Sequence, residues 1–325
     1  MCVSSCRASR PRSLTAASVA HDPLASSDLI AERRFAYGKA AANDGDWSAA
    51  ADLYEQTVEQ APDWAAAWFA LAEARERLGD FDAAARAFRG TLAADAADAQ
   101  GAAARLALIG RGDAPDALPP AYVARLFNDY APRFDAHLIK NLGYRAPALL
   151  AGGLSVATPD RRFASALDFG CGTGLMGEAL RDRVNRLTGV DLAPGMIAKA
   201  RRRGAYDELK VGDAVAMLTS GPRASFDLIV AADALVYIGD LAPLFAAVGT
   251  ALTPDGLFAF SVETCEDHEF NLEPTMRFAH GRSYVERTAH EAGFQPLLVQ
   301  PASTRREAGA DAPGLICVFR RAVGA

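Results

Sequence analysis

The 325-residue sequence has no uninterrupted apolar run long enough to cross a membrane, although half of its residues are hydrophobic. A membrane-spanning helix needs about 18 such residues in succession. Basic side chains are not in excess either, because 34 Lys and Arg stand against 40 Asp and Glu, a net charge of −6. Proteins that bind nucleic acids usually carry a basic face. We therefore expect neither a membrane nor a nucleic acid as a partner.

Cysteine is scarce and irregularly spaced. Two cysteines separated by two residues are typical of zinc sites, and no such pair occurs in this sequence. The odd total of five also does not fit a framework of disulfides. We expect no metal site and a reducing, cytoplasmic location. The cysteines are Cys2, Cys6, Cys171, Cys265 and Cys317.

The first twenty residues contain no acidic side chain and are rich in serine, and their charges are Arg7, Arg10 and Arg12. Such a composition resembles that of an organellar transit peptide. A disordered leader, or a start codon placed too far upstream, explains it equally simply. Residues 1–27 are therefore expected to form a leader that lies outside the folded domains.

An internal repeat with a period of 34 residues follows this leader. This period is the length of one tetratricopeptide unit, a helix–turn–helix pair. Glycine fits the turn between the two helices, alanine allows them to approach closely, and an aromatic ring fills the groove between neighbouring units. The repeat relates Gly45 to Gly79, Ala50 to Ala84, Tyr54 to Phe88 and Thr57 to Thr91.

Residues 28–110 therefore look like an all-α tetratricopeptide domain. Two units cover 31–64 and 65–98, with Asp28–Asn43 as the first helix, and the alanine-rich residues 99–110 form a cap or a decayed unit. So short an array has little concave surface and needs a neighbour to cover its apolar faces. The repeats could bind a protein partner, or they could be a structural or dimerising appendage.

From residue 121 onward, strands alternate with helices, which indicates an α/β domain with a parallel, doubly wound sheet. A linker rich in Pro and Gly, residues 111–120, precedes this domain, which covers 121–325. The last two strands are joined by a long loop and would complete the sheet as an antiparallel hairpin. The expected strands are Phe163–Phe169, Arg186–Val190, Leu209–Val211, Phe226–Ala231, Gly256–Val262, Phe294–Gln300 and Gly314–Arg320.

A glycine-rich loop, residues 170–174, joins the first strand to a helix. Glycine lets the backbone turn sharply and approach a ligand, and the helix offers its unpaired N–H groups. Asp191 ends the second strand about 20 residues later, where a carboxylate can accept hydrogen bonds from both ribose hydroxyls. The loop also fits the dinucleotide pattern GxGxxG, which is a weak signal alone. Asp168, beside the loop, would repel a pyrophosphate but suits a cofactor that carries an ammonium and a sulfonium.

Four ordered motifs resemble those of the class I S-adenosylmethionine-dependent methyltransferases, and the resemblance covers about residues 120–322. The motifs are ALDFGCGTG at 166–174, GVDLAPGM at 189–196, Asp213-Ala214, and the stretch 226–235. The resemblance implies S-adenosylmethionine as cofactor and S-adenosylhomocysteine as product, although a generic nucleotide binder of the same fold stays an alternative. The cofactor-binding residues implied are Tyr130, Asp168, Gly170, Cys171, Gly172, Gly174, Asp191, Leu192, Met196, Asp213, Ala214 and Ala231.

The sequence FNDYAPRFD at 127–135 is similar to a helix that lies over the cofactor as a lid in small-molecule methyltransferases, including bacterial ones preceded by tetratricopeptide repeats. Phe127, Tyr130 and Phe134 are spaced to share one face of that helix. Tyr130 and Phe134 would then face the transferred methyl group. An amphipathic helix packed on the sheet is the plainer interpretation.

The methyl acceptor is less clear from the sequence. No Asn/Asp-Pro-Pro-Tyr follows the fourth strand, which weighs against methylation of an amide or of the adenine amino group. The irregular segment 263–284 is the expected acceptor pocket, with His280 as a general base because its usual pKa is near neutrality. The run from His280 to Ala292 is expected to be helical, so His280 and Tyr284, four residues apart, would share a face. A surface or helix-capping histidine would look the same. The expected pocket residues are Phe134, Glu263, Arg277 and Tyr284, and Arg277, Arg305 and Arg306 suit a carboxylate or phosphate.

The basic run at 199–203 is expected to be a solvated helix face. The function that the sequence predicts is methyl transfer from S-adenosylmethionine to a small acidic or hydroxylated molecule. The alternative is a protein methyltransferase recruited through the repeats, or a partner-docking protein whose second domain binds a cofactor for regulation.

Overall fold

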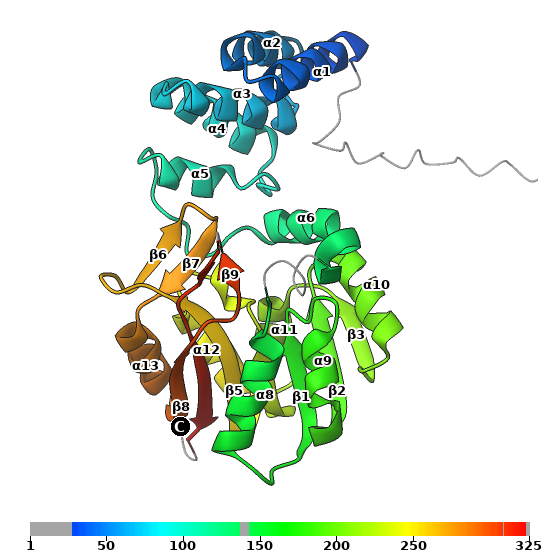
Figure 1. Cartoon of the computed structure of the whole chain (residues 1–325), viewed down its shortest axis with the longest axis vertical. Coiled ribbons are helices and arrows are strands. Elements are labelled where there is room, and N and C mark those ends of the chain that lie inside the picture. The colour runs from blue at the N-terminus through cyan, green and yellow to red at the C-terminus, as the bar shows by residue number, and fades with distance from the viewer. Residues whose placement is uncertain (1–27, 137–142, 308, 323–325) are drawn as a thin grey trace, which may run out of the picture.

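The computed structural model of the chain describes residues 28–136, 143–307 and 309–322. The leader expected at residues 1–27 lies outside them. A stack of helices precedes an α/β unit, and the two meet along one edge (Figure 1). No helix within the described ranges is long and apolar enough to cross a bilayer.

The helical part consists of two antiparallel pairs followed by one short helix, so the expected tetratricopeptide architecture is confirmed. The second helix of each pair begins alike, because Asp46 and Asp80 each accept a hydrogen bond at 3.0 Å from the backbone N–H three residues later. Such a cap satisfies donors that a helix start leaves unpaired. The helices are α1 (Leu29–Asn43), α2 (Trp47–Gln60), α3 (Ala65–Arg77), α4 (Phe81–Ala94) and α5 (Ala102–Leu108).

Small residues at the helix contacts allow aromatic rings to pack between the helices. A Cβ added to Gly38 would lie 2.6 Å from the Tyr54 ring, and one added to Gly90 would lie 2.6 Å from the Trp68 ring. Ala84 is fully buried in the same core. The period of 34 residues therefore reflects a repeated packing arrangement as well as repeated turns.

Replacing Ala84 with tryptophan should destabilise the protein by about 1–3 kcal/mol, because the larger side chain overpacks a filled contact between helices. Ala40→Trp is the control, since Ala40 is exposed on α1. Urea unfolding followed by circular dichroism measures both changes. Equal stability of the two variants would mean that the repeats are not tightly packed.

The α/β unit has a central sheet in the strand order β3-β2-β1-β4-β5-β11-β8. The first five strands along this order are parallel, and β11 is antiparallel to both β5 and β8, so the expected C-terminal hairpin is confirmed. The strands are β1 (Phe163–Phe169), β2 (Val184–Asp191), β3 (Glu208–Val211), β4 (Phe226–Ala231), β5 (Leu252–Thr264), β8 (Phe294–Ala302) and β11 (Gly314–Arg321).

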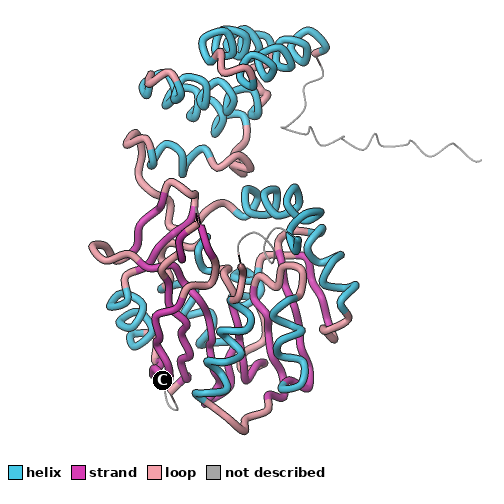
Figure 2. Tube along the Cα trace, in the orientation of Figure 1, coloured by secondary structure: helices cyan, strands magenta, loops and turns pink. Residues whose placement is uncertain are grey.

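Helices cover both faces of the sheet, and each face has its own apolar core (Figure 2). Leu150 and Leu180 belong to the core on one face, and Phe245 and Val285 belong to the core on the other. The helices are α8 (Ala146–Ala157), α9 (Leu175–Leu180), α10 (Pro194–Arg203), α11 (Ala214–Ser220), α12 (Ala242–Ala251) and α13 (Arg282–Glu291), with short 3-10 turns η2 (Arg181–Arg183) and η3 (Leu235–Tyr237). Two further short strands, β9 (Arg306–Glu307) and β10 (Ala310–Asp311), pair with each other.

The segment expected to be irregular forms a short antiparallel hairpin, β6 (Phe270–Glu273) and β7 (Arg277–His280), and β7 adds to the end of β5. His280 therefore lies in a strand, and the helix expected to include it begins at Arg282. The hydrogen bonds between β6 and β7 pair the backbone N–H and C=O groups of this segment, although its sequence shows no clear alternation of apolar and polar residues.

The repeats contact the α/β unit through α5. Gly101, before α5, lies against Tyr122 of helix α6 (Pro120–Tyr130) and against Met276 of the β6–β7 turn. Arg125 of α6 donates to the carbonyl of Ala99 at 3.2 Å. Within the expected linker 111–120, Leu118 is buried and its N–H donates to the Tyr237 carbonyl. The limits of the two domains stay a prediction.

Candidate active site

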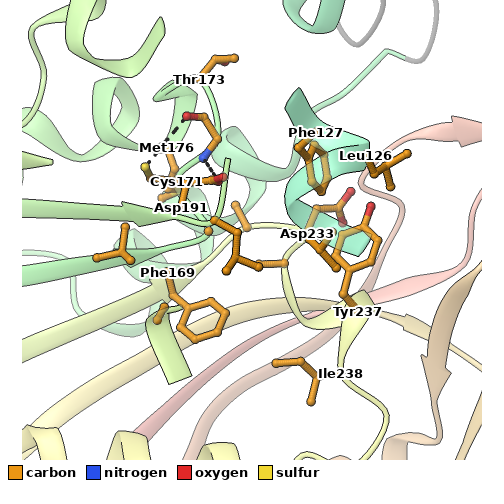
Figure 3. Close-up of a pocket in the computed structure, with 18 of the residues that line it drawn as sticks. Leu126, Phe127, Phe169, Cys171, Thr173, Met176, Asp191, Asp233, Tyr237 and Ile238 are labelled. Carbon is orange, nitrogen blue, oxygen red and sulfur yellow. Dashed lines mark hydrogen bonds between the residues drawn. The ribbon is translucent and has the colours of Figure 1, made fainter. Parts of the chain in front are cut away.

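A cavity of about 450 Å³ lies at the carboxyl ends of β1, β2 and β4, beneath α6 (Figure 3). Binding sites of open α/β sheets lie at this edge because the strand order reverses there. Of the expected cofactor residues, the cavity is lined by Tyr130, Gly170, Cys171, Gly172, Asp191, Leu192, Asp213 and Ala214.

The glycine loop has the backbone that its sequence predicts. Gly170 and Gly172 have φ values of 68° and 53°, a region that other residues rarely adopt. A Cβ added to Gly170 would lie 2.7 Å from the Cβ of Ala234, whereas one added to Gly172 would meet no atom within 4 Å. Gly172 lines the cavity, so its missing side chain leaves room for a ligand close to the main chain.

Asp191 joins the loop to the end of β2. Its Oδ2 accepts from the Gly172 N–H at 2.9 Å, and its Oδ1 accepts from the Ala193 N–H at 2.8 Å. Burial raises the pKa of Asp191, and the two backbone hydrogen bonds act against that rise by favouring the ionised form. Each oxygen has a further lone pair, so the carboxylate is fixed in place and can still accept hydrogen bonds from a ligand.

Asp168 does not line the cavity, contrary to the expectation. It is fully buried below the loop, where the Tyr206 hydroxyl donates to its Oδ2 at 2.6 Å. Its Oδ1 has no hydrogen-bond partner among the described residues. Burial raises the pKa of Asp168 to about 7. Tyr206, which the sequence did not single out, fits here because Gly189 has no side chain: a Cβ at Gly189 would lie 2.8 Å from the ring.

Three other expected cofactor residues also lie outside the cavity lining. Gly174 is the N-cap of α9 and faces Ala200 and Arg203. Met196 is fully buried under the lid segment, and Ala231 is fully buried in the centre of the sheet. The motifs lie in segments that border the cavity, but not every residue of a motif points into it. Successive strand residues face opposite sides of the sheet, and successive helix residues point in different directions around the axis.

The helix that is expected to act as a lid lies above the cavity. The rings of Phe127 and Phe134 lie edge to face with centroids 6.0 Å apart, and those of Tyr130 and Phe134 lie 5.1 Å apart. Phe127 also contacts Tyr237 on the far wall, at 5.5 Å. All four rings line the cavity, so α6 and the turn η1 (Ala131–Arg133) close it with an aromatic wall.

Hydrogen bonds hold the lid to the glycine loop. Thr173 of the loop donates to Asp135 at 2.5 Å, and Arg203 of α10 donates to the other oxygen of Asp135 at 2.9 Å. Arg203 also donates to the Thr173 carbonyl at 2.7 Å. The basic run at 199–203 is therefore not only a solvated face, because Arg203 connects the lid, the loop and α10.

A cluster of charged side chains forms another wall. Arg277 donates to Glu263 at 2.6 Å and to Asp233 at 3.4 Å, and Arg305 also pairs with both carboxylates. Asp233 has a φ of 58°, an uncommon backbone for a residue with a side chain. Asp233, Arg277 and Arg305 line the cavity with Tyr144 and Tyr237, whereas Glu263 stands behind the two arginines. The sequence did not single out Asp233, Tyr144 or Tyr237 individually.

His280 cannot act as the expected base in this geometry. Its side chain is fully buried, and its Nε2 lies 2.9 Å from the Ile238 carbonyl and 3.1 Å from the Gly239 carbonyl. Burial lowers its pKa to about 4. Tyr284 is also outside the cavity lining, because its hydroxyl donates to Asp240 at 2.9 Å and accepts from the Leu241 N–H. Both side chains stabilise the fold below the site.

Folding should depend on pH through His280. Its pKa is about 6.5 in the unfolded chain and about 4 in the folded one. The unfolded chain alone therefore binds a proton between these values, so the stabilisation is complete above pH 6.5 and is lost as the pH falls towards 4, by up to about 1.4 kcal/mol per pH unit.

Urea unfolding at several pH values across this window measures the effect. The free energy of unfolding of the wild type should fall more steeply with acid than that of His280→Gln, which cannot titrate. Asp168 contributes with the opposite sign, since its pKa is raised in the folded state, but it does so equally in both proteins. Parallel curves would show that His280 is not buried in its neutral form.

No group of three or more His, Cys, Asp or Glu side chains in the described part of the chain could hold a metal ion. The described cysteines are free thiols, Cys171, Cys265 and Cys317.

Comparison with protein families gives two matches. Residues 167–260 match the model described as a methyltransferase domain, and residues 31–74 match a tetratricopeptide repeat. The chain carries a methyltransferase domain. The glycine loop, Asp191, Asp213 and Asp233 all lie within the matched residues of this domain.

Curated proteins also match part of the chain. A malonyl-[acyl-carrier protein] O-methyltransferase from Enterobacter lignolyticus is 33% identical over 139 residues, which are 43% of this chain and 52% of that protein. A ubiquinone biosynthesis O-methyltransferase from Xylella fastidiosa is 35% identical over 128 residues, 38% of this chain and 50% of that protein. The chain thus spans about half the length of the curated relatives that it matches.

Among solved structures, the 1,6-didemethyltoxoflavin-N1-methyltransferase of Burkholderia thailandensis has a similar fold. The TM-score is 0.51 at 22% identity, over 65% of this chain and 93% of that one. The fold of the methyltransferase domain is therefore the Rossmann-like fold that the sequence predicts.

Proposed function

We propose that this chain transfers a methyl group from S-adenosylmethionine to an oxygen of a small acidic or hydroxylated acceptor. The observation that carries the proposal is the hydrogen bond from the glycine loop to Asp191, which lies in the cavity beneath the aromatic lid. Both partners belong to the matched methyltransferase domain. The names of the curated relatives cited above are both those of O-methyltransferases, which favours oxygen as the acceptor atom.

The residues of the cavity fit this cofactor. Asp191 has lone pairs for two ribose hydroxyls, and the open space at Gly172 lets the ligand lie against the main chain. Asp213 uses Oδ1 to cap α11, which leaves Oδ2 to accept from an adenine amino group. The unpartnered Oδ1 of Asp168 lies below the loop and suits a bridging water that would bind the ammonium group.

The cofactor, when bound, supplies an electrophilic methyl group. The chain's own residues then position the acceptor and exclude water, which are the main contributions to an in-line displacement. Phe127, Tyr130 and Phe134 present aromatic rings to the cavity, and such rings attract a sulfonium through the cation–π interaction. The contact of Asp135 with Thr173 keeps this lid against the loop that holds the cofactor.

Calorimetry with the full chain tests the cofactor assignment. We expect S-adenosylmethionine and S-adenosylhomocysteine to bind at one site, and NAD to bind much more weakly because Asp168, below the glycine loop, disfavours a pyrophosphate. Tight binding of NAD together with no binding of S-adenosylmethionine would overturn the proposal.

Tyr130→Ala should weaken the binding of S-adenosylmethionine by about 0.5–2 kcal/mol, because one aromatic face of the lid is lost. Tyr37→Ala is the control, since Tyr37 is an exposed tyrosine on α1, far along the chain. Calorimetry of the two variants measures the difference. An unchanged affinity of Tyr130→Ala would mean that α6 is a structural helix and not a lid.

A second role involves the repeats, because α5 packs against α6 and the β6–β7 hairpin beside the cavity. A protein that binds the repeats would therefore lie next to the acceptor entrance and could be the substrate or a regulator. Affinity capture with the tagged full chain, compared with a variant whose exposed repeat residues Tyr37 and Phe81 are both alanine, tests this role. The cytoplasmic location stays a prediction from the cysteine pattern.

A further inference from the structure

The wall of the cavity contributed by β7 and the segment after β8 carries two buried cations, Arg277 and Arg305. Their side chains are 16% and 7% exposed, and both line the cavity. Arginine in a buried position must be paired, and Glu263 accepts from both guanidinium groups from behind, at 2.6 Å for Arg277. The backing carboxylate fixes the orientation of the cations before any ligand arrives.

The opposite side of this cluster is held more loosely. Asp233 Oδ2 lies 3.4 Å from Arg277 and 3.9 Å from Arg305, which are long distances for charged hydrogen bonds. Arg277 has five N–H donors and gives three, to Glu263, Asp233 and the Tyr237 hydroxyl. Two N–H groups of Arg277 thus have no protein partner in the described part of the chain. The planar guanidinium binds best to a ligand that offers a pair of oxygens in one plane, such as a carboxylate.

The described lining of the cavity lacks the side chains that most often act as bases at neutral pH. Among the described residues its lining contains neither His nor Lys. Each lining carboxylate already accepts hydrogen bonds from the protein: Asp191 from two amides, Asp213 from two amides, and Asp233 from Thr304 at 3.0 Å. Burial raises the pKa of Cys171 and of the lining tyrosines, so these groups keep their own protons.

An acceptor that arrives protonated, such as an alcohol or an ammonium, needs a base to become a nucleophile. A carboxylate is already ionised at neutral pH and needs none. The oriented arginines, and the lack of His and Lys in the described lining, therefore favour the same chemical group. The rest of the acceptor must be apolar, because Leu118, Leu126 and Ile238 line the same cavity.

We propose that the acceptor is the carboxylate of a molecule with an apolar body, that Arg277 and Arg305 hold it, and that the product is a methyl ester. The inference rests on the proposed function and narrows it. One carboxylate oxygen forms a bond to the methyl carbon while the carbon–sulfur bond breaks. The electron pair of the broken bond goes to sulfur, the sulfonium becomes a neutral thioether, and no proton is released.

The binding test uses the full chain saturated with S-adenosylhomocysteine and two matched probe series, straight-chain carboxylic acids of four to ten carbons and the amides of the same lengths. We expect an acid to bind at least tenfold more tightly than its amide, by calorimetry. Arg277→Lys keeps the positive charge but loses the planar guanidinium that can donate two parallel hydrogen bonds. It should remove the preference for the acid without changing the affinity for S-adenosylhomocysteine. Arg181→Lys is the control, because Arg181 binds Asp207 and two carbonyls at β2, outside the cavity lining.

The transfer test uses S-adenosylmethionine labelled in the methyl group, with the acids and the alcohols of the same lengths. A methyl ester releases labelled methanol in mild alkali, whereas a methyl ether does not, so we expect alkali-labile label on the acids. Equal binding of acid and amide by the wild type, or alkali-stable label on the alcohols, would overturn the inference. Either result, obtained with a protein that binds S-adenosylmethionine, would leave the proposed function intact. Loss of cofactor binding would instead remove the proposed function itself.

Discussion

Replacing Asp191 with alanine should weaken the binding of S-adenosylmethionine by about 1.5–3 kcal/mol, which is roughly ten- to 150-fold. The carboxylate at the end of β2 bonds the glycine loop through the Gly172 N–H, and it also lines the cavity. Its removal takes away the acceptor for the ribose hydroxyls and also releases the loop. Calorimetry measures the loss.

Asp227→Ala is a matched control for this experiment. Asp227 also accepts from two backbone N–H groups, those of Ala164 and Ser165 at 2.8 and 2.9 Å, but it lies at the opposite end of the sheet. Both variants lose a carboxylate that fixes two amides, so both should be less stable. Only Asp191→Ala should lose cofactor affinity. If the two variants bound the cofactor equally well, Asp191 would be a structural residue and the ribose contact would be wrong.

The repeats could be predicted from the sequence because their signals are local and occur twice. A positive φ at Gly45 and Gly79, a cap from Asp46 and Asp80, and a buried alanine one turn later each depend on a few neighbouring residues. The same holds for the glycine loop and for Asp191, which lie within about 20 residues of one another. Turns and helix caps of this kind can be predicted from the types of a few neighbouring residues.

Some residues of the cofactor motifs do not line the cavity because their side chains face away from it. Asp168 and Phe169 are adjacent in β1, and only Phe169 lines the cavity, because neighbouring strand residues point to opposite faces. A motif identifies the strand but does not say which face the ligand contacts. Tyr206 was missed because it meets Asp168 from a loop 38 residues later in the chain.

The acceptor side of the site could not be assembled from the sequence. Its charged residues, Asp233, Glu263, Arg277 and Arg305, come from four separate segments that only the sheet brings together. The expected base failed for a related reason: β6 and β7 are four residues each, too short to give a clear alternation, and a helix was expected at His280 instead. Pairing with β5 decides that His280 is buried.

Replacing Gly172 with leucine should abolish detectable binding of S-adenosylmethionine, a loss of at least about a thousandfold, or 4 kcal/mol. Two effects combine. The φ of 53° strains any residue with a Cβ, and the side chain would enter the open space that the loop leaves beside the cavity. Asp191, which bonds the Gly172 N–H, would move with the loop. Calorimetry with the purified variant measures the affinity.

Gly204→Leu separates these two effects. Gly204 has a φ of 70° at the C-cap of α10, and a Cβ there would also meet no atom within 4 Å, but Gly204 does not line the cavity. Backbone strain is therefore nearly matched between the two variants, so their losses of folding stability should be similar, at about 1–3 kcal/mol. Only the variant at Gly172 places its new side chain where the cofactor would lie. Normal cofactor affinity in Gly172→Leu would show that the ligand binds elsewhere, because a site formed by this loop has no room for both the side chain and the cofactor.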